Sequence, residues 1–507
     1  MRTRHTISEY ISALEAAGIL LEAAIPESLT SRAVDCLTYD TRKLSPNALF
    51  ICKGAHFKEE YLTAALSSGA MAYIAETVHP IDAPHILVSD IRHALTVLGQ
   101  LYYNNVTDRL ISVGITGTKG KSTTAYYMRS ILNSFLAAQS KPQCAILSSI
   151  DNYDGVINEE SHITTPEVLE LYQHFQNAYD SAISHLVMEV SSQGLKYGRV
   201  RNMKFTVGAW LNIGTDHISP IEHSDFEDYF DAKLKIFDHC HSACLNTDAE
   251  YAERVLEYAK KSPCKLYTFG SHADDTVYCS KIEKREDGLY FDIQSPKYNG
   301  EFSITMPGLF NVSNALAAMA MCLALDIPEE YVRAGLRTAR AGGRMQVYES
   351  RDREVTVIVD YAHNRMSFDA LYRSTEIEYP GAEIISVFGC PGKKALLRRK
   401  DLGELSGKHC SHVYITEEDS GEEPFESIAA DIAKHVTCPY TVLEDRDECI
   451  RRAILEHPKR RVILLTGKGE ETRMKRGTEY VDFPSDVEMA LRHLKTYDEK
   501  RSYHDEA

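Results

Sequence analysis

Hydrophobic and polar positions alternate between two patterns in the first hundred residues. The runs NALFICKG at 47–54 and AYIAE at 72–76 have the length and apolar content of buried strands. Between them, YLTAALSSGA at 61–70 is typical of a helix that ends at a glycine. Strands therefore mix with helices in the first part of the chain, which we expect to form an α/β unit covering residues 1–107.

The first 25 residues carry apolar positions that acidic residues interrupt. Glu9, Glu15 and Glu22 break up the apolar run that a secretory signal would need. This stretch is predicted to form an amphipathic helix.

A second pattern begins at about residue 108. RLISVGITGTKGKSTTAYYMRSIL at 109–132 gives an apolar strand, a glycine-rich loop and a helix in succession. Further short apolar runs follow at 185–192, 205–212 and 242–248, and helical segments precede the first two. Strands alternating with helices are typical of a mostly parallel α/β sheet, so residues 108–342 are predicted to form a central domain.

The alternation starts again after residue 342. Apolar runs at 355–362, 383–389, 412–418 and 460–469 are separated by helical segments. This predicts a third, doubly wound, Rossmann-like domain over residues 343–507. A chain of 507 residues agrees with three domains of about 100–200 residues each.

Composition limits the possible partners. The formal net charge is −17, which argues against nucleic acid, because phosphate backbones need basic grooves. Any anionic substrate must therefore meet locally clustered Lys and Arg. The 12 cysteines form no short disulfide framework, so we expect reduced thiols in the cytoplasm. No run of 18 apolar residues suggests a membrane span. We expect a monomer.

The most specific motif is the loop GITGTKGKS at 114–122. Its glycines allow backbone N–H groups to turn toward phosphate oxygens, and the following helix adds its positive end. Lys121 is expected to hold the terminal phosphates, and the Ser122 hydroxyl to reach Mg²⁺. Ile115 departs from the strict spacing of a phosphate-binding loop, whereas the GTKGKS core fits a narrower family.

This loop and the motifs on either side of it resemble the Mur ligase family, specifically the UDP-N-acetylmuramoyl-tripeptide synthetases. The resemblance covers residues 38–471 in the family's order. Within the family, DHISPIEHSDFEDYF at 216–230 looks most like the lysine-adding enzymes of some Gram-positive bacteria. The motifs that carry the resemblance are TYDTRKLSPNALFICKGAHFKEEYL, ITTPEVLELY, MEVSSQGLKYGRV, LNIGTDHISPIEHSDFEDYFDAK, GLFNVSNALAA, GGRMQVYE, VDYAHN and LLTGKGEE.

The resemblance implies a UDP-binding domain, a central P-loop ATPase domain and a C-terminal Rossmann-like domain. It also implies a reaction in two steps. ATP phosphorylates the D-glutamate carboxylate of UDP-N-acetylmuramoyl-L-alanyl-D-glutamate, and the amino group of a free amino acid then attacks the acyl phosphate. This chemistry needs dense positive charge around the transferred phosphate.

The resemblance further implies the residues that act on ATP and metal. Lys121, Lys233, His217 and Arg344 would be catalytic, and Arg344 suits a phosphate in transit. Lys233 is carbamylated in the family, which would turn its amine into an anionic ligand. The implied metal ligands are Ser122, Glu189, His217 and carbamylated Lys233. The implied ATP-binding residues are Gly117, Thr118, Lys119, Gly120, Lys121, Ser122, Thr123, Asn314, Arg344, Asp360, His363 and Arg399.

For the UDP-linked substrate, six positions match the family. Thr41 and Arg42 correspond to its Asp-Ser-Arg motif, with Thr replacing Ser. The muramoyl-peptide part is expected to contact Thr164, Thr165, Ser191 and Arg199. Tyr197 stands where many relatives have Gln, so no contact is carried over for it.

The identity of the added amino acid rests on the segment TEEDSGEEP at 416–424. Diaminopimelate-adding relatives carry Asp-Asn-Pro-Arg there, and their Arg grips the distal carboxylate. This segment has no Arg and five acidic residues, so it would attract an ammonium and repel a second carboxylate. Lysine or ornithine is therefore favoured, with Asp419 and Glu471 as the amino-acid-binding residues. A solvated acidic loop is the alternative.

Three other functions fit parts of the pattern. A folylpolyglutamate synthetase would share the loop but lack the UDP domain before it. A Mur-like paralogue could use another amine. A nucleotide-binding regulator without catalysis is disfavoured because Lys121, Glu189, His217, Lys233 and Arg344 occur together.

Overall fold

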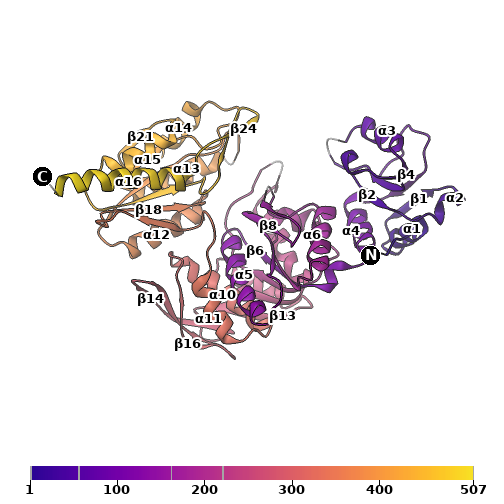
Figure 1. Cartoon of the computed structure of the whole chain (residues 1–507), viewed down its shortest axis with the longest axis horizontal. Helices are drawn as coiled ribbons and strands as arrows, with labels where there is room; N and C mark the ends of the chain where they lie inside the picture. Colours follow the sequence, from indigo (N-terminus) through magenta and orange to yellow (C-terminus); the bar gives the residue numbers. More distant parts are fainter. Residues whose placement is uncertain (1–2, 55–56, 162, 220–221, 395, 506–507) are drawn as a thin grey trace.

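The computed structural model describes residues 3–54, 57–161, 163–219, 222–394 and 396–505. Three units follow one another along the long axis of the molecule, with the N-terminal and C-terminal units at opposite ends (Figure 1). Their sheets take strands from residues 20–88, 111–304 and 346–466. The α/β class with a mostly parallel central sheet is confirmed, while the exact boundaries at 107 and 342 stay predictions.

The N-terminal unit is a five-stranded sheet in the order β1-β5-β4-β3-β2, with β1 alone antiparallel to its neighbour. The predicted N-terminal helix is too long. It ends at Ala16, Gly18 turns the chain with a φ of +68°, and the following residues form an edge strand instead. The elements are α1 (Ile7–Ala16), β1 (Leu20–Ala24), α2 (Glu27–Thr30), β2 (Cys36–Thr38), β3 (Ala48–Ile51), α3 (Glu59–Ser67), β4 (Ala70–Ala75), β5 (His85–Val88) and α4 (Ile91–Tyr102).

The central sheet has eleven strands in the order β16-β15-β14-β13-β12-β11-β6-β10-β7-β8-β9. Neighbours from β14 through β7 run parallel, and an antiparallel extension lies at each edge. The strands are β6 (Ile111–Thr116), β7 (Ala145–Leu147), β8 (Asp151–Tyr153), β9 (Asn158–Glu160), β10 (His185–Glu189), β11 (Phe205–Trp210), β12 (Cys240–Asn246), β13 (Lys265–Gly270), β14 (Val277–Arg285), β15 (Gly288–Gln294) and β16 (Asn299–Ile304). The helices are α5 (Lys121–Ala137), α6 (Val168–Asp180), α7 (Ser192–Lys196), α8 (Phe226–Leu234), α9 (Ala252–Ala259), α10 (Phe310–Ala324) and α11 (Glu329–Thr338).

The register of this sheet positions the phosphate loop. β6 lies between β10 and β11, and Glu189 at the end of β10 pairs with Ile115, just before the loop. Parallel strands end at the same edge, so the loop, Glu189 and the segment after β11 meet there.

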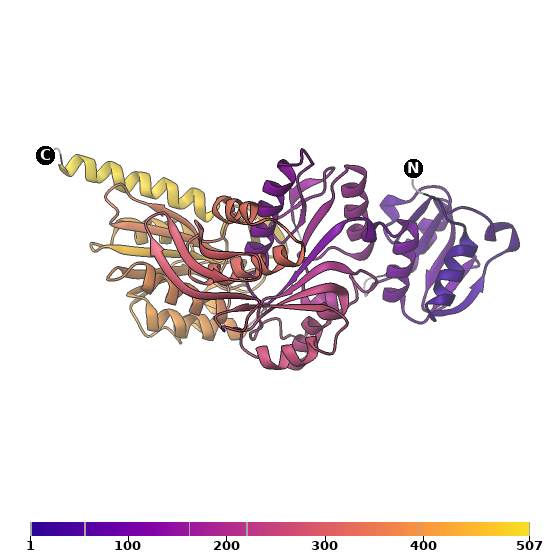
Figure 2. The same cartoon turned by 90° about the horizontal axis from the view of Figure 1, so that it is seen from below.

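The C-terminal unit has a six-stranded sheet in the order β17-β18-β22-β19-β20-β21, with only β17 antiparallel. β18 and β22 are buried along their whole length, as strands covered on both faces are. Helix α16 runs along this unit and projects beyond it (Figure 2). The elements are β17 (Gln346–Glu349), β18 (Val355–Asp360), α12 (Arg365–Glu378), β19 (Glu383–Phe388), α13 (Leu396–His409), β20 (His412–Ile415), α14 (Phe425–Ala433), β21 (Tyr440–Val442), α15 (Arg446–Leu455), β22 (Arg461–Thr466), β23 (Arg473–Arg476), β24 (Glu479–Asp482) and α16 (Asp486–Asp505).

Within the described parts of the chain, no helix combines the length and the apolar content needed to cross a bilayer.

Candidate active site

The phosphate loop joins β6 to α5, and its shape requires glycine. Gly120 has a φ of +84°, and a Cβ there would lie 2.2 Å from the Asn314 side-chain oxygen. No side chain caps the start of α5, so its first N–H groups remain available to an anion. The Lys121 ammonium donates to the Gly117 carbonyl at 3.0 Å, which holds it over the loop. These features fit the phosphate-binding role predicted from the sequence.

A cavity of about 360 Å³ opens in front of this loop, between the central and C-terminal domains. Most of the predicted ATP-binding residues lie together on its wall. Those that line it are Thr118, Lys119, Gly120, Lys121, Ser122, Thr123, Asn314, Arg344, Asp360 and His363, along with Thr164, Glu189 and His217 from the other predicted sets.

Buried cations dominate the loop side of the cavity. Burial lowers the pKa of Lys119 to about 7, and it also lowers the pKa of Lys121, although Glu189 opposes the latter shift. Burial places the pKa of His363 well below its usual value, so this ring is neutral near pH 7. An arriving phosphate would supply the negative charge that these ammonium groups lack, which strengthens its binding in a low-dielectric site.

Ser122, Ser149 and Glu189 form a polar cluster at the end of β10. The Glu189 carboxylate accepts the Ser149 N–H at 2.8 Å and the Ser149 hydroxyl at 3.2 Å. The Ser149 hydroxyl in turn lies 3.0 Å from the Ser122 hydroxyl, and an Arg344 N–H points at Ser122 from 3.4 Å. The Arg344 guanidinium stacks 4.7 Å from the centre of the Tyr361 ring. Hard oxygen groups and a guanidinium thus converge beside Lys121.

Lys233 is buried behind the loop, outside the cavity wall. Its amine donates to the Gly117 carbonyl at 2.9 Å, and burial brings its pKa well below the ordinary value for lysine. Lys121 and Lys119 lower it further. A neutral amine at this depth is a free nucleophile, which matters for the modification predicted there.

His217 lines the cavity with a φ of +57°, a conformation that non-glycine residues rarely adopt. Its ring bonds the Glu222 carboxylate at 2.9 Å. No three His, Cys, Asp or Glu side chains gather as a metal centre in the described ranges. The predicted Mg²⁺ set of Ser122, Glu189, His217 and Lys233 is therefore incomplete without phosphate oxygens or a modified lysine.

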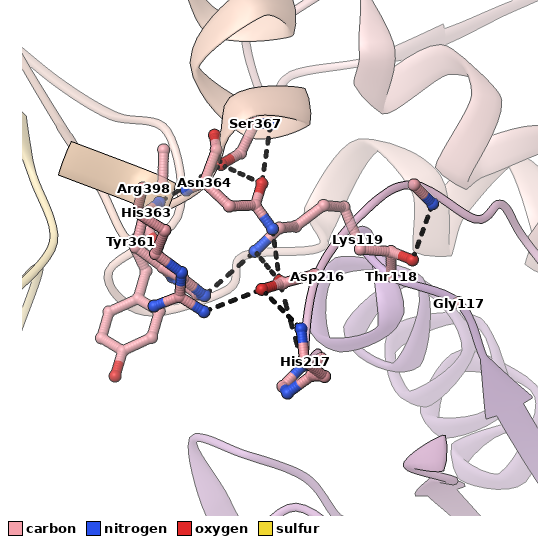
Figure 3. Close-up of polar contacts among 12 residues, drawn as sticks. Gly117, Thr118, Lys119, Asp216, His217, Tyr361, His363, Asn364, Ser367 and Arg398 are labelled. Atoms are coloured by element: carbon pink, nitrogen blue, oxygen red, sulfur yellow. Dashed lines mark hydrogen bonds and ion pairs between the residues drawn. The ribbon is translucent and has the colours of Figure 1, made fainter. Parts of the chain in front are cut away.

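Asp216 and its partners form a second polar cluster, shown in Figure 3. The Asp216 carboxylate accepts an Arg398 N–H at 2.9 Å and the Asn364 amide, and Lys119 lies 3.9 Å away. Burial opposes ionisation of Asp216, but Lys119 and Arg398 outweigh it and keep the pKa of this carboxyl well below normal. Lys119 also contacts the His363 ring at 3.1 Å.

Two predicted ATP-binding residues do not line the cavity: Gly117, whose carbonyl accepts from Lys121 and Lys233, and Arg399. Its guanidinium bonds Glu423 at 2.7 and 2.8 Å and Asp431 at 3.1 Å, within the C-terminal domain. The neighbouring Arg398 points to Asp216 instead. Because a helix turns by about 100° per residue, an assignment shifted by one position selects the wrong face.

One predicted UDP-substrate residue, Arg199, lines a cavity of about 830 Å³ at the junction of the N-terminal and central domains, together with Tyr39 and Lys53, among others. Thr164 lines the phosphate cavity instead. Arg199 donates to the Thr165 carbonyl at 2.9 Å, and the Thr165 hydroxyl donates to the Glu189 carbonyl at 3.0 Å. These bonds connect this junction to strand β10, which ends at Glu189.

Three predicted UDP-substrate residues, Ser191, Arg42 and Thr41, do not line the cavities at this junction. Ser191 caps α7, accepting the Gly194 N–H at 3.0 Å. Arg42 is exposed and bonds Asp40, and neither it nor Thr41 lines the junction cavities, whereas Asp40 and Tyr39 do.

The predicted amino-acid residues Asp419 and Glu471 are brought together by Lys468. Its ammonium lies 3.1 Å from an Asp419 oxygen and 2.6 Å from a Glu471 oxygen. Glu471 also accepts the Tyr361 hydroxyl at 2.6 Å, which connects this site to the nucleotide cavity. Both carboxylates are thus already paired with the same lysine of the chain, whose single charge they share.

Glu418, next to Asp419, is a buried carboxylate to which the sequence analysis gave no role. It is buried against Gly467, and no hydrogen bond or ion pair to it is found among the described residues. Burial raises the pKa of Glu418 to about 7, although nearby Arg446 opposes the shift. Asp216, Ser149 and Arg398 were missed as well; the position of Asp216 directly before His217 was the available signal.

Two family models match the central and the C-terminal parts of the chain. Residues 115–322 match the Mur ligase middle domain, and residues 343–469 match the domain described as Mur ligase, glutamate ligase domain. The UDP-N-acetylmuramoyl-L-alanyl-D-glutamate--L-lysine ligase of Streptococcus agalactiae is 35% identical over 464 residues, which cover 91% of this chain and 92% of that protein.

Solved structures agree on the fold. The structure of a UDP-N-acetylmuramoyl-L-alanyl-D-glutamate--2,6-diaminopimelate ligase superposes with a TM-score of 0.67 at 20% identity, covering 99% of this chain and all of that one. A folylpolyglutamate synthase of Mycobacterium tuberculosis has a TM-score of 0.59 at 16% identity and covers only 74% of this chain and 92% of its own. Identity and coverage together show that the chain belongs to the Mur ligase family.

Proposed function

We propose that this protein is an ATP-dependent ligase that adds L-lysine to UDP-N-acetylmuramoyl-L-alanyl-D-glutamate during peptidoglycan precursor synthesis. The observation that carries the proposal is the cavity itself, where a glycine loop, two buried lysines and Arg344 converge on one volume. The relative from Streptococcus agalactiae, which is named for this reaction, supports the substrate assignment.

The chain's own groups divide the work on the nucleotide. The loop N–H groups and Lys121 bind the phosphates, and Arg344 approaches the phosphate in transit from the opposite wall. Asn314 closes the loop from behind, and His363 and Asp360 form the C-terminal wall. Closure between these walls excludes water, which would otherwise hydrolyse the acyl phosphate.

The residues around Ser122 fit a divalent cation. Ser122 and Glu189 present oxygen ligands beside Lys121, and His217 faces the same cavity. Mg²⁺ held there would neutralise charge on the transferred phosphate. Lys233 is suited to carbamylation because a buried, neutral amine reacts with carbon dioxide, and the resulting carbamate would replace a neutral amine by an anion.

The UDP-linked substrate is proposed to occupy the junction cavity beside Arg199 and Lys53. Its D-glutamate end would then point along Thr164 and Thr165 toward the phosphate loop. Lys53 and Arg199 both pair with Glu167 in this structure, so an anionic substrate can take over these cations.

The incoming amino acid is proposed to enter from the C-terminal domain, near Glu418, Asp419 and Glu471. We assign lysine because Glu418 has no ion pair among the described residues on this side, and because relatives that are 35% identical are named for lysine. We place the reaction in the cytoplasm, where the twelve free cysteines would stay reduced, and propose that the protein acts as a monomer.

The proposal is tested by measuring phosphate release from ATP with and without the two other substrates. We expect release only when the UDP-linked dipeptide is present, and amide formation only when lysine is added. Lys121→Ala should abolish both, and Lys261→Ala, which changes an exposed lysine, should abolish neither. ATP hydrolysis that ignores the UDP-linked dipeptide would contradict the assignment.

A further inference from the structure

Asp216 is a buried carboxylate at the seam between the central and C-terminal domains. It follows β11 in the loop that also carries His217, and its side chain is 4% exposed. Two residues earlier, Gly214 approaches α12 so closely that a Cβ there would meet the Met366 side chain at 2.3 Å. The loop that carries Asp216 is therefore packed tightly against the C-terminal domain.

Two side chains of the C-terminal domain converge on this carboxylate (Figure 3). Arg398 on α13 donates to one Asp216 oxygen at 2.9 Å, and the Asn364 amide donates to the other. Asn364 also caps α12 by accepting the Ser367 N–H at 3.1 Å. Asp216 thus binds the starts of two helices of the neighbouring domain at once.

The central domain supplies the opposite side of the contact. Lys119 of the phosphate loop lies 3.9 Å from Asp216 and bonds His363 of the C-terminal domain at 3.1 Å. Without Asp216, the Arg398 guanidinium would lose its carboxylate partner at the seam, and Lys119 would lose the carboxylate that favours its charged form. A buried guanidinium without its counter-ion is strongly unfavourable, so loss of this contact favours separation of the domains.

We propose that Asp216 is a positioning residue that holds the C-terminal domain against the phosphate loop, so that the cavity wall formed by Tyr361, His363 and Met366 stays in place for the reaction. The kinetic part of this inference rests on the proposed function; the structural part does not. Lys119 belongs both to the phosphate loop and to this interdomain contact, so the contact couples the position of the C-terminal domain to the reaction site.

Another interdomain contact provides a matched control. Glu378 on α12 accepts the Gly308 N–H of the central domain at 3.0 Å and is also buried, but it does not line the phosphate cavity. Glu378→Gln keeps an acceptor at this contact and should leave the ligation rate close to that of the wild type.

The test compares Asp216→Asn, Arg398→Gln and the double variant with Glu378→Gln and the wild type. Solution X-ray scattering without nucleotide should give a larger radius of gyration for the first three proteins only. Ligation kinetics should show kcat lowered about 100-fold, with the KM for ATP changed by less than about threefold. The double variant should be no slower than either single variant, since both remove the same contact.

Unchanged scattering for both single variants, or losses that multiply in the double variant, would overturn the inference. Arg398→Gln probes the contact from the other domain, so a folding failure of Asp216→Asn does not remove the test. A wild-type protein that forms no amide product would refute the proposed function alone, because the scattering comparison needs no activity.

Discussion

The phosphate cavity and the acidic segment at 416–424 differ in how their charges are satisfied. In the cavity, Lys119 and Lys121 are buried, and their pKa values are lowered by burial. In the acidic segment, most carboxylates already have a cation from the same chain. The pairs are Glu417 with Arg476, Asp419 with Lys468, Glu422 with Lys393, and Glu423 with Arg399.

The difference shows what a charge pattern in a sequence can and cannot tell. A glycine loop fixes the backbone and leaves its lysines facing a defined volume. A run of acidic residues says nothing about which carboxylates remain available, because partners arrive from distant elements such as β23 and α13. In the acidic segment, Glu418 is the carboxylate left without an ion pair among the described residues.

The largest effect should come from the cavity. Lys121→Ala removes the ammonium that the loop carbonyls hold over the phosphate site, so ligation should fall about 1000-fold or more. Heat denaturation should show no loss of stability, because the removed ammonium is a buried charge. A ligation rate of Lys121→Ala within tenfold of the wild-type rate would contradict the view that the cavity lysines, rather than the acidic segment, carry the largest effect.

Lys233 should have the next largest effect. Lys233→Ala is expected to lower ligation about 100-fold, as loss of a residue that supports a metal does. Intact-protein mass spectrometry under native conditions should detect one added carbamate on the wild type and none on the variant. Activity that is unaffected by removing carbon dioxide from the buffer, and an unmodified mass, would contradict carbamylation.

Glu418 sharpens the comparison within the acidic segment. Glu418→Gln should raise the KM for lysine about tenfold, whereas Asp419→Asn, which alters a carboxylate already paired with Lys468, should raise it less. A larger effect of Asp419→Asn would reverse the assignment of the available carboxylate.

The pH dependence of the free energy of unfolding tests Glu418 independently. Burial raises the pKa of Glu418 to about 7 from an unfolded value of 4.5, so the native state holds its proton longer. The resulting stabilisation is present below pH 4.5 and is lost as pH rises to about 7, by about 3 kcal/mol. Chemical denaturation at pH 5 and pH 8 should show this loss in the wild type and a smaller one in Glu418→Gln; equal losses would contradict it.

Arg399 should give the smallest effect on activity. Arg399→Ala breaks its bonds to Glu423 and Asp431 and should lower the free energy of unfolding by about 2 kcal/mol. The KM for ATP should change by less than about twofold, because the guanidinium does not reach the cavity. A KM raised tenfold with unchanged stability would restore the ATP contact predicted from the sequence.

Much of the fold could be predicted from hydrophobic patterning. Strands such as β6, β18 and β22 are mostly apolar and almost wholly buried, and glycine loops mark the ends that carry chemistry. The predicted N-terminal helix was too long because the apolar pattern of residues 20–24 is compatible with either a helix or a strand. Pairing with β5 decided it, and that pairing is a contact between residues more than sixty positions apart.

The residues of the candidate site likewise divide into those that the sequence could predict and those that it could not. Lys121, Glu189 and Arg344 could be predicted because each stands in a motif whose backbone geometry the sequence dictates. Asp216 and Arg398 could not, because their roles depend on two domains meeting. The direction of Arg399 could not be predicted either, because a shift of one residue along a helix turns a side chain to another face, and it is the neighbouring Arg398 that reaches Asp216. The assignment of Asp419 stays a prediction.

The most direct test of the central claim is ligation by the purified protein, read by mass spectrometry. The reaction would contain ATP, Mg²⁺, UDP-N-acetylmuramoyl-L-alanyl-D-glutamate and one of lysine, ornithine, diaminopimelate or a neutral amino acid. We predict an amide product with lysine, formed together with ADP. A product with diaminopimelate but not lysine would contradict the specificity, and no product with any of these amines would contradict the ligase assignment.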